Sequence, residues 1–168
     1  MTLTRRAALV LPAAVTAPAV AQNFFTPASA PDRPLFEIAA SRGMTYGCAV
    51  TGKLITDEPD FAALVARDAG VLVPEYEAKF AALQPAEGRF DFAPLDAITT
   101  WAGHFRKAVR GHALVWHQDL PDWARAALAE SPGRARAVME AHFDRVLSTT
   151  RARIRDWDVV NEPIANPP

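Results

Sequence analysis

Four short, largely apolar runs recur along this chain, and the segments between them are patterned as helices. The runs cover residues 46–50, 71–73, 108–115 and 154–160. Their apolar residues tend to follow one another instead of alternating with polar ones, which is typical of parallel strands covered on both faces. The pattern predicts an α/β chain built from βαβ units, and both an open doubly wound sheet and a (β/α)8 barrel fit it.

Helix signals between the runs support this interpretation. Residues 60–69 and 95–105 show helical spacing, and Ser131 is predicted to cap a further helix with Pro132 in its first turn. The apolar face of that helix comprises Ala135, Val138, Met139, His142, Phe143, Val146 and Leu147. The aromatic residues expected in the core are Trp101, Trp123, Trp157 and His142.

Polar side chains follow three of the runs at the point where each run ends. Glu75 follows the second run, residues 112–118 follow or end the third, and Asn161 and Glu162 follow the fourth. The carboxyl ends of parallel strands meet at one edge, where α/β proteins bind ligands and barrels gather their catalytic groups. We therefore expect the functional site at this edge.

Glu162 has a placement suited to a proton donor. Strict alternation along a strand would send Asn161 and Glu162 to opposite faces. Both can line one pocket only if the strand has ended, and Pro163 favours an end because it cannot continue the ladder. A carboxyl group on a rigid strand tip beside an amide suits general acid catalysis. An ordinary exposed carboxylate fits the same pattern.

Composition argues against several classes of function. The formal net charge of −1 offers no basic patch for nucleic acid or an anionic membrane. No Gly-rich phosphate loop occurs, and the single cysteine, Cys48, is expected to be a small buried residue. His112 and His117 would face opposite ways on a strand and no third ligand is evident, so we expect no metal site. Asp156 and Asp158 are interpreted as structural.

The N-terminal residues have the order of a secretory signal peptide. Arg5 and Arg6 precede an uncharged run that ends in a small-x-small cleavage signal, and paired arginines suit the twin-arginine export route. The run is shorter than the roughly 20 residues of a membrane-anchoring helix and is broken by proline. We expect a signal peptide at residues 1–21, a leader and N-terminal segment at residues 22–43, and an exported, periplasmic or secreted protein with no membrane segment after cleavage.

Three segments resemble one known family. Residues 109–124 (VRGHALVWHQDLPDWA) and 157–163 (WDVVNEP) closely resemble the third- and fourth-strand signatures of glycoside hydrolase family 10, the endo-1,4-β-xylanases. Residues 73–92 (VPEYEAKFAALQPAEGRFDF) resemble its second-strand segment. The resemblance extends over about residues 44–163, in the family's order and spacing. It implies that residues 44–168 form the N-terminal half of a (β/α)8 TIM barrel, about its first four βα units.

The resemblance also implies a role for each matched residue. Glu162 falls on the general acid/base, and Asn161 falls on the amide that holds the 2-hydroxyl of the sugar being cleaved. Four further residues fall on positions that line the glycone side of the cleft: Glu75, Lys79, His112 and Trp116. Carboxylate, ammonium and imidazole groups hydrogen-bond sugar hydroxyls, and an indole packs against the C–H face of a sugar. Tyr76 departs from the family, which usually has Asn there, so one sugar hydrogen bond is lost or replaced.

The implied activity is that of a cofactor-free, retaining endo-1,4-β-xylanase acting on xylan or xylo-oligosaccharides. Such enzymes also need a carboxylate nucleophile, which the resemblance places after the seventh strand. We expect it to lie outside this chain, so that the chain is an N-terminal fragment and inactive alone. The alternatives are another retaining barrel β-glycanase of the cellulase or mannanase type, and a non-catalytic glycan-binding fragment. The oligomeric state is left open.

Overall fold

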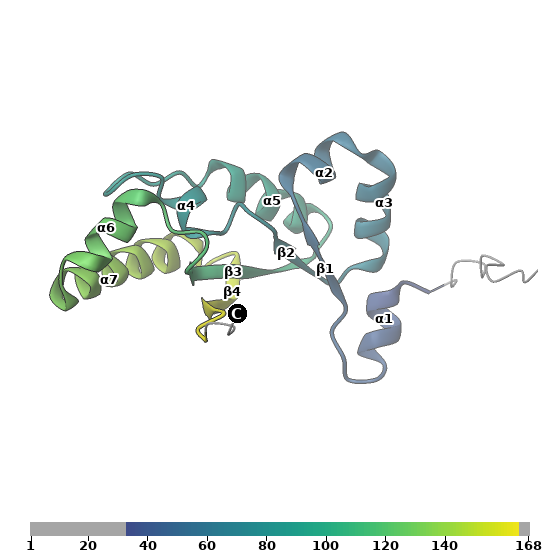
Figure 1. The fold of residues 1–168 in the computed structure, drawn as a ribbon. Coiled ribbons are helices and arrows are strands. Elements are labelled where there is room, and N and C mark those ends of the chain that lie inside the picture. Colours follow the sequence, from purple (N-terminus) through teal and green to yellow (C-terminus); the bar gives the residue numbers. More distant parts are fainter. Residues whose placement is uncertain (1–32, 165–168) are drawn as a thin grey trace, which may run out of the picture. The chain divides into compact units, whose positions relative to one another are not determined.

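The computed structural model describes residues 33–164, which belong to one compact unit spanning residues 31–168. The predicted signal peptide at residues 1–21 and most of the N-terminal leader lie outside the described residues. The elements are α1 (Leu35–Ala40), β1 (Gly47–Val50), α2 (Gly52–Asp57), α3 (Pro59–Asp68), β2 (Val71–Pro74), α4 (Phe80–Leu83), α5 (Ala93–His104), β3 (Ala108–Trp116), α6 (Asp122–Glu130), α7 (Pro132–Thr150) and β4 (Ile154–Asn161) (Figure 1).

The four strands form one parallel sheet in the order β1-β2-β3-β4 (Figure 1). The longest pairing joins β3 to β4, from Val109 opposite Ile154 to Trp116 opposite Asn161, with two shifts of register between them. Because all strands run in one direction, their carboxyl ends lie at the same edge of the sheet. The predicted α/β class, with parallel strands joined by helices, is confirmed.

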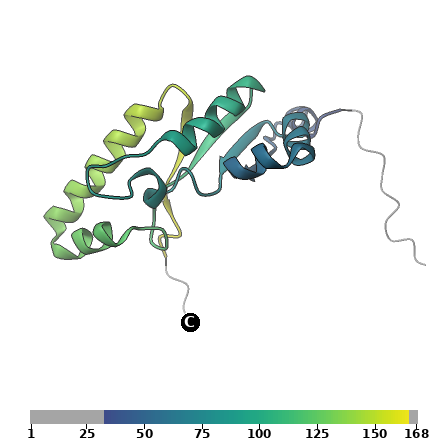
Figure 2. The same ribbon diagram turned by 90° about the horizontal axis from the view of Figure 1, so that it is seen from above.

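The helices form largely where the sequence predicts them. α3 begins at Pro59, and α7 begins at Pro132 with the Ser131 hydroxyl accepting the Arg134 N–H at 3.2 Å. That bond satisfies one of the N–H groups that a helix start leaves without an internal partner. α6 and α7 pack side by side as a helical hairpin (Figure 2). The short helices α1, α2 and α4 have no counterpart in the prediction.

His142 is a core residue, as predicted. Its side chain is 0% exposed. The imidazole ring stacks on the Phe80 ring with 3.7 Å between centroids, and Nδ1 lies 2.8 Å from Oε1 of Gln84. Since an amide oxygen only accepts, Nδ1 of His142 carries the proton in this contact.

The other residues expected in the core pack against it and remain partly exposed. Trp101 and Trp157 contact the main cluster of buried side chains, and Trp123 contacts a second cluster formed by residues of α4, β3, α6 and α7. Trp157 lies so close to the neighbouring strand that a Cβ on Gly111 would meet its ring at 2.2 Å. Only glycine fits at position 111. Cys48 is half-buried against the main cluster, and this burial raises the pKa of its thiol.

β4 departs from the expected burial on both faces. Val159 and Val160 are 50% and 51% exposed. Within the described residues β4 pairs only with β3, so its other edge and part of its surface have no covering element. Between residues 33 and 164, no helix has the length and apolar character needed to cross a membrane.

Candidate active site

Glu162 lies immediately beyond the carboxyl end of β4, where the chain leaves the sheet. Asn161 is the last strand residue and pairs with Trp116. Glu162 has a φ of 48°, in the left-handed region that residues with a Cβ rarely adopt. The next residue, Pro163, has no N–H to extend the ladder. The strand therefore ends where Pro163 predicts, and the Glu162 side chain is freed from strict alternation.

The Glu162 carboxylate is held by the neighbouring strand. Nε1 of Trp116, the last residue of β3, donates a hydrogen bond to Oε2 of Glu162 at 2.8 Å. Lys79 precedes α4 and places its Nζ over the Trp116 ring, 4.5 Å from the centroid, in a cation–π contact. These three predicted site residues come from separate segments and form one connected group.

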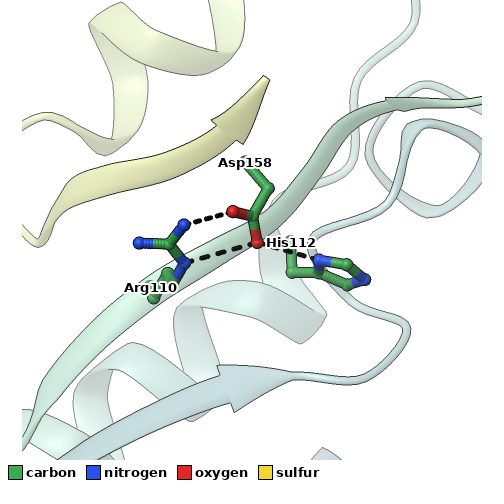
Figure 3. Close-up of polar contacts among 3 residues, drawn as sticks. All are labelled: Arg110, His112 and Asp158. Atoms are coloured by element: carbon green, nitrogen blue, oxygen red, sulfur yellow. Dashed lines mark hydrogen bonds and ion pairs between the residues drawn. The ribbon is translucent and has the colours of Figure 1, made fainter. Parts of the chain in front are cut away.

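His112 belongs to a second polar group on the same two strands. Asp158 of β4 points toward Arg110 and His112 of β3 (Figure 3). Oδ2 of Asp158 lies 3.3 Å from Nε of Arg110 and 3.0 Å from Nδ1 of His112, and a further bond joins Arg110 to Oδ1. The hydrogen bond from Arg110 is the main cause that lowers the pKa of Asp158, and the contact with His112 adds to it.

This arrangement fixes how His112 presents its ring. An ionised carboxylate only accepts hydrogen bonds, so Nδ1 of His112 donates to Asp158. Nε2 lies on the far side of the ring from Asp158 (Figure 3). It is left to exchange a hydrogen bond with another group, such as a sugar hydroxyl. Asp158 thus orients the ring of His112, one of the residues predicted to bind sugar.

Glu75 and Asn161 stand apart from these two groups. The Glu75 N–H donates to the carbonyl of Val50 at 2.9 Å, which extends the β1–β2 pairing by one step, and its side chain is exposed. Within residues 33–164, the Glu75 carboxylate forms no hydrogen bond with another predicted site residue. Asn161 shares a cavity wall with Glu162 instead.

A cavity of about 460 Å³ lies beside the end of β4. Its lining consists of Val115, His117, Leu120, Val160, Asn161, Glu162 and Pro163. Asn161 and Glu162 therefore line one pocket, as the sequence predicts for a strand that ends at Pro163. Most of the remaining wall is apolar and offers few partners for sugar hydroxyls. The polar partners of Glu162 lie outside this wall: Trp116 donates to its carboxylate, and Lys79 lies over the Trp116 ring.

Sequence patterns alone did not predict the Arg110–Asp158–His112 group. Asp158 was interpreted as structural, and Arg110 received no role. The only signal available was that both lie in the segments that resemble the xylanase signatures. Their pairing depends on the register between β3 and β4, which shifts between Val109 and Arg110. Sequence spacing does not reveal such a shift.

The family model for glycosyl hydrolase family 10 matches residues 35–168, which is most of the chain. The chain belongs to glycoside hydrolase family 10. It is 29% identical over 126 residues to endo-1,4-beta-xylanase 3 of Hypocrea jecorina, a match over 75% of this chain and 36% of that protein. It is 32% identical over 141 residues to endo-1,4-beta-xylanase 1 of Humicola insolens, over 82% of this chain and 32% of the relative.

Solved structures of the family share the fold. A family 10 xylanase of Thermobacillus composti superposes with a TM-score of 0.70 at 32% identity, over 79% of this chain and 41% of its own. Endo-1,4-beta-xylanase XylE of Penicillium canescens gives a TM-score of 0.74 at 26% identity, over 80% of this chain and 41% of its own. An intracellular xylanase of Thermoanaerobacterium saccharolyticum, solved as a mutant with xylotetraose, gives a TM-score of 0.70 at 30% identity, over 80% of this chain and 45% of its own. The described residues thus adopt part of the family's barrel fold, and the chain spans less than half the length of these relatives.

Proposed function

We propose that this chain supplies the acid/base part of the active site of a retaining endo-1,4-β-xylanase, with Glu162 as the general acid/base. The family membership and the xylanase names of the relatives support the substrate. One observation supports the role of Glu162: it leaves the strand end and accepts a hydrogen bond from Trp116, beside the Lys79 ammonium group. A substrate bound at these polar groups would lie next to the carboxyl group.

The hydrogen bond from Trp116 distinguishes the two oxygens of Glu162. An indole N–H only donates, so Oε2 is an acceptor in either protonation state. The proton of the neutral acid is then on Oε1, which delivers it to the glycosidic oxygen as the leaving group departs. The resulting carboxylate takes a proton from water when the glycosyl-enzyme is hydrolysed.

The surrounding side chains orient the sugar in this proposal. The Lys79 ammonium group donates hydrogen bonds to hydroxyls, and Nε2 of His112 exchanges one with a hydroxyl because Nδ1 is engaged by Asp158. The Asn161 amide, next to Glu162, is placed to hold a hydroxyl of the sugar being cleaved. Holding the substrate in a reactive geometry contributes to the rate alongside the proton transfer.

The second carboxylate of the mechanism is proposed to come from outside the described residues. A retaining mechanism needs a nucleophile about 5–5.5 Å from the acid/base. In the family that the chain resembles, this residue follows the seventh strand, and the residues that the structure describes contain four strands. We therefore expect the polypeptide of residues 1–168 to release no sugar from xylan by itself.

A chimeric protein tests the proposed function. The chain is joined to the remaining portion of a family 10 xylanase, and reducing-sugar release is measured on xylan, carboxymethylcellulose and mannan. We expect turnover of xylan that is lost in the Glu162→Gln variant and kept in Glu140→Gln, an exposed control position on α7.

Three outcomes would contradict the proposal. Preferential release from carboxymethylcellulose or mannan would assign the chain to another class of β-glycanase. Sugar release by the chain alone, lost on Glu162→Gln, would show that a second carboxylate lies within the chain. Binding of xylan without any turnover in the chimera would favour a non-catalytic, glycan-binding role.

We also propose that the protein is exported. Arg5, Arg6 and the uncharged run that follows support a cleaved signal peptide. Expression of the chain in a bacterium, followed by N-terminal sequencing of the extracytoplasmic fraction, should give Gln22 as the first residue. Recovery of the protein from the cytoplasm alone, with residues 1–21 intact, would contradict export.

A further inference from the structure

Tyr76 presents an exposed aromatic ring at the edge of the sheet where Glu162 lies. It follows β2 by two residues, and 58% of its surface is exposed. Its backbone is held in place: its N–H donates to Oε2 of Glu77 at 3.3 Å, and Oε1 of Glu77 accepts the Gly52 N–H at 2.7 Å. The ring therefore stands on an anchored segment.

Lys79 links this ring to the group around Glu162. Its N–H donates to the carbonyl of Tyr76 at 3.0 Å, which closes a turn. Its Nζ lies 5.1 Å from the centroid of the Tyr76 ring and 4.5 Å from that of Trp116. Trp116 in turn donates to Glu162. Tyr76 is thus three contacts from the acid/base, with an ammonium group between two aromatic rings.

We propose that Tyr76 is a specificity-determining residue whose ring packs against the C–H face of a neutral pyranose bound beside Lys79. The inference rests on the proposed function and specifies how the glycan is held. Lys79 lies over one face of the ring, and more than half of the Tyr76 surface remains exposed and accessible to a ligand. Pyranoses with only equatorial substituents, as in β-1,4-linked xylose, present C–H bonds on both faces. Aromatic rings bind such faces by dispersion and burial of apolar area.

The chain offers a matched control for this proposal. Its only other tyrosine, Tyr46, is 40% exposed and precedes β1 at the opposite edge of the sheet. The test uses the 168-residue chain and xylohexaose. Binding is followed by the NMR shift of the Trp116 indole N–H, which is assigned by its loss in Trp116→Phe.

Removing the ring should weaken binding and keeping it should not. Tyr76→Ala is expected to raise the Kd on the order of five- to tenfold, from the energy of one aromatic packing contact. The Kd of Tyr76→Phe and of Tyr46→Ala should stay within about twofold of the wild-type value, because an aromatic ring remains at position 76 in both variants. An unchanged Kd in Tyr76→Ala, with wild-type binding present, would overturn the role of Tyr76 and leave the proposed function standing.

A second pair of variants separates direct contact from an effect through Lys79. Tyr76→Ala is measured again in a Lys79→Met background. A direct sugar contact predicts a similar fold-change in Kd in both backgrounds. If the effect of Tyr76→Ala disappears when Lys79 is absent, Tyr76 only holds the ammonium group and the proposal is wrong. A wild-type chain that binds no xylohexaose would contradict both this inference and the proposed function.

Discussion

Acidification should destabilise the folded protein through His142, which is buried between Phe80 and Gln84. Burial lowers the pKa of His142 from 6.5 to about 4. Between these values the unfolded chain binds a proton at this site that the folded protein does not bind. The free energy of unfolding therefore falls as the pH drops from about 6.5 to about 4, and this group has no further effect below that range. Above about pH 6.5 His142 is neutral in both the folded and the unfolded state, so its contribution to the free energy of unfolding no longer changes with pH.

The size of the effect follows from the shift. About 2.5 pKa units at 1.36 kcal/mol each correspond to a loss of about 3 kcal/mol across this range. Urea unfolding is measured between pH 7.5 and pH 4 for the wild type and for His142→Gln, whose side chain does not titrate. The free energy of unfolding of the variant should be lower than that of the wild type at pH 7.5, but it should fall by about 3 kcal/mol less between pH 7.5 and pH 4. Parallel curves for the two proteins, or an NMR titration of His142 with a midpoint near 6.5, would show that burial does not lower the pKa of His142.

Three further predictions concern the sheet. Gly111→Ala should lower the free energy of unfolding, measured in urea, by about 1–3 kcal/mol because the new Cβ meets the Trp157 ring. Gly133→Ala, where a new Cβ meets nothing within 4 Å, should not lower it; equal effects of the two substitutions would contradict the packing of Trp157 on Gly111. Asp158→Asn should lower the melting temperature at pH 7. The difference from wild type should shrink as the pH falls below about 3.9, because the lowered pKa of Asp158 contributes stability only while the carboxyl is ionised. A difference in melting temperature that is independent of pH would argue against the ion pair. Because β4 pairs only with β3 among the described residues, we expect the wild-type chain to self-associate through this strand in sedimentation velocity, and Val159→Lys should reduce the association because a charge on an exposed edge strand opposes strand pairing. A wild-type chain that stays monomeric, or equal association of both proteins, would contradict this expectation.

Local signals in the sequence were sufficient to predict those helices and strands that depend mainly on their own residues. The apolar runs predict all four strands to within one or two residues of their ends, and Ser131 with Pro132 predicts the start of α7. Pro163 predicts the end of β4, and with it the position of Glu162 beyond the strand. These features follow from backbone geometry and capping, which act over a few residues.

Elements that depend on distant partners could not be predicted in this way. The first turn of α2 has a local cap, because the Thr51 hydroxyl accepts the Leu54 N–H at 3.1 Å, but it is also bonded by the Glu77 side chain, which accepts the Gly52 N–H from 25 residues away. The Ala81 N–H in α4 is accepted by Asp119, 38 residues away. The contact between Asp158 and His112 likewise depends on how β3 and β4 are aligned. Such partners become visible only once the strands are placed side by side.

The role of Glu162 as general acid/base is tested by comparing two leaving groups in the chimeric enzyme. Glu162→Ala should lower kcat/KM on xylan by about 10²- to 10⁴-fold, because the sugar leaving group needs protonation. The first step with a dinitrophenyl xylobioside should proceed almost unchanged, because that leaving group needs no proton. Rapid release of dinitrophenol followed by slow turnover is therefore the predicted result. An equal loss of the first step on both substrates would contradict the assignment of Glu162.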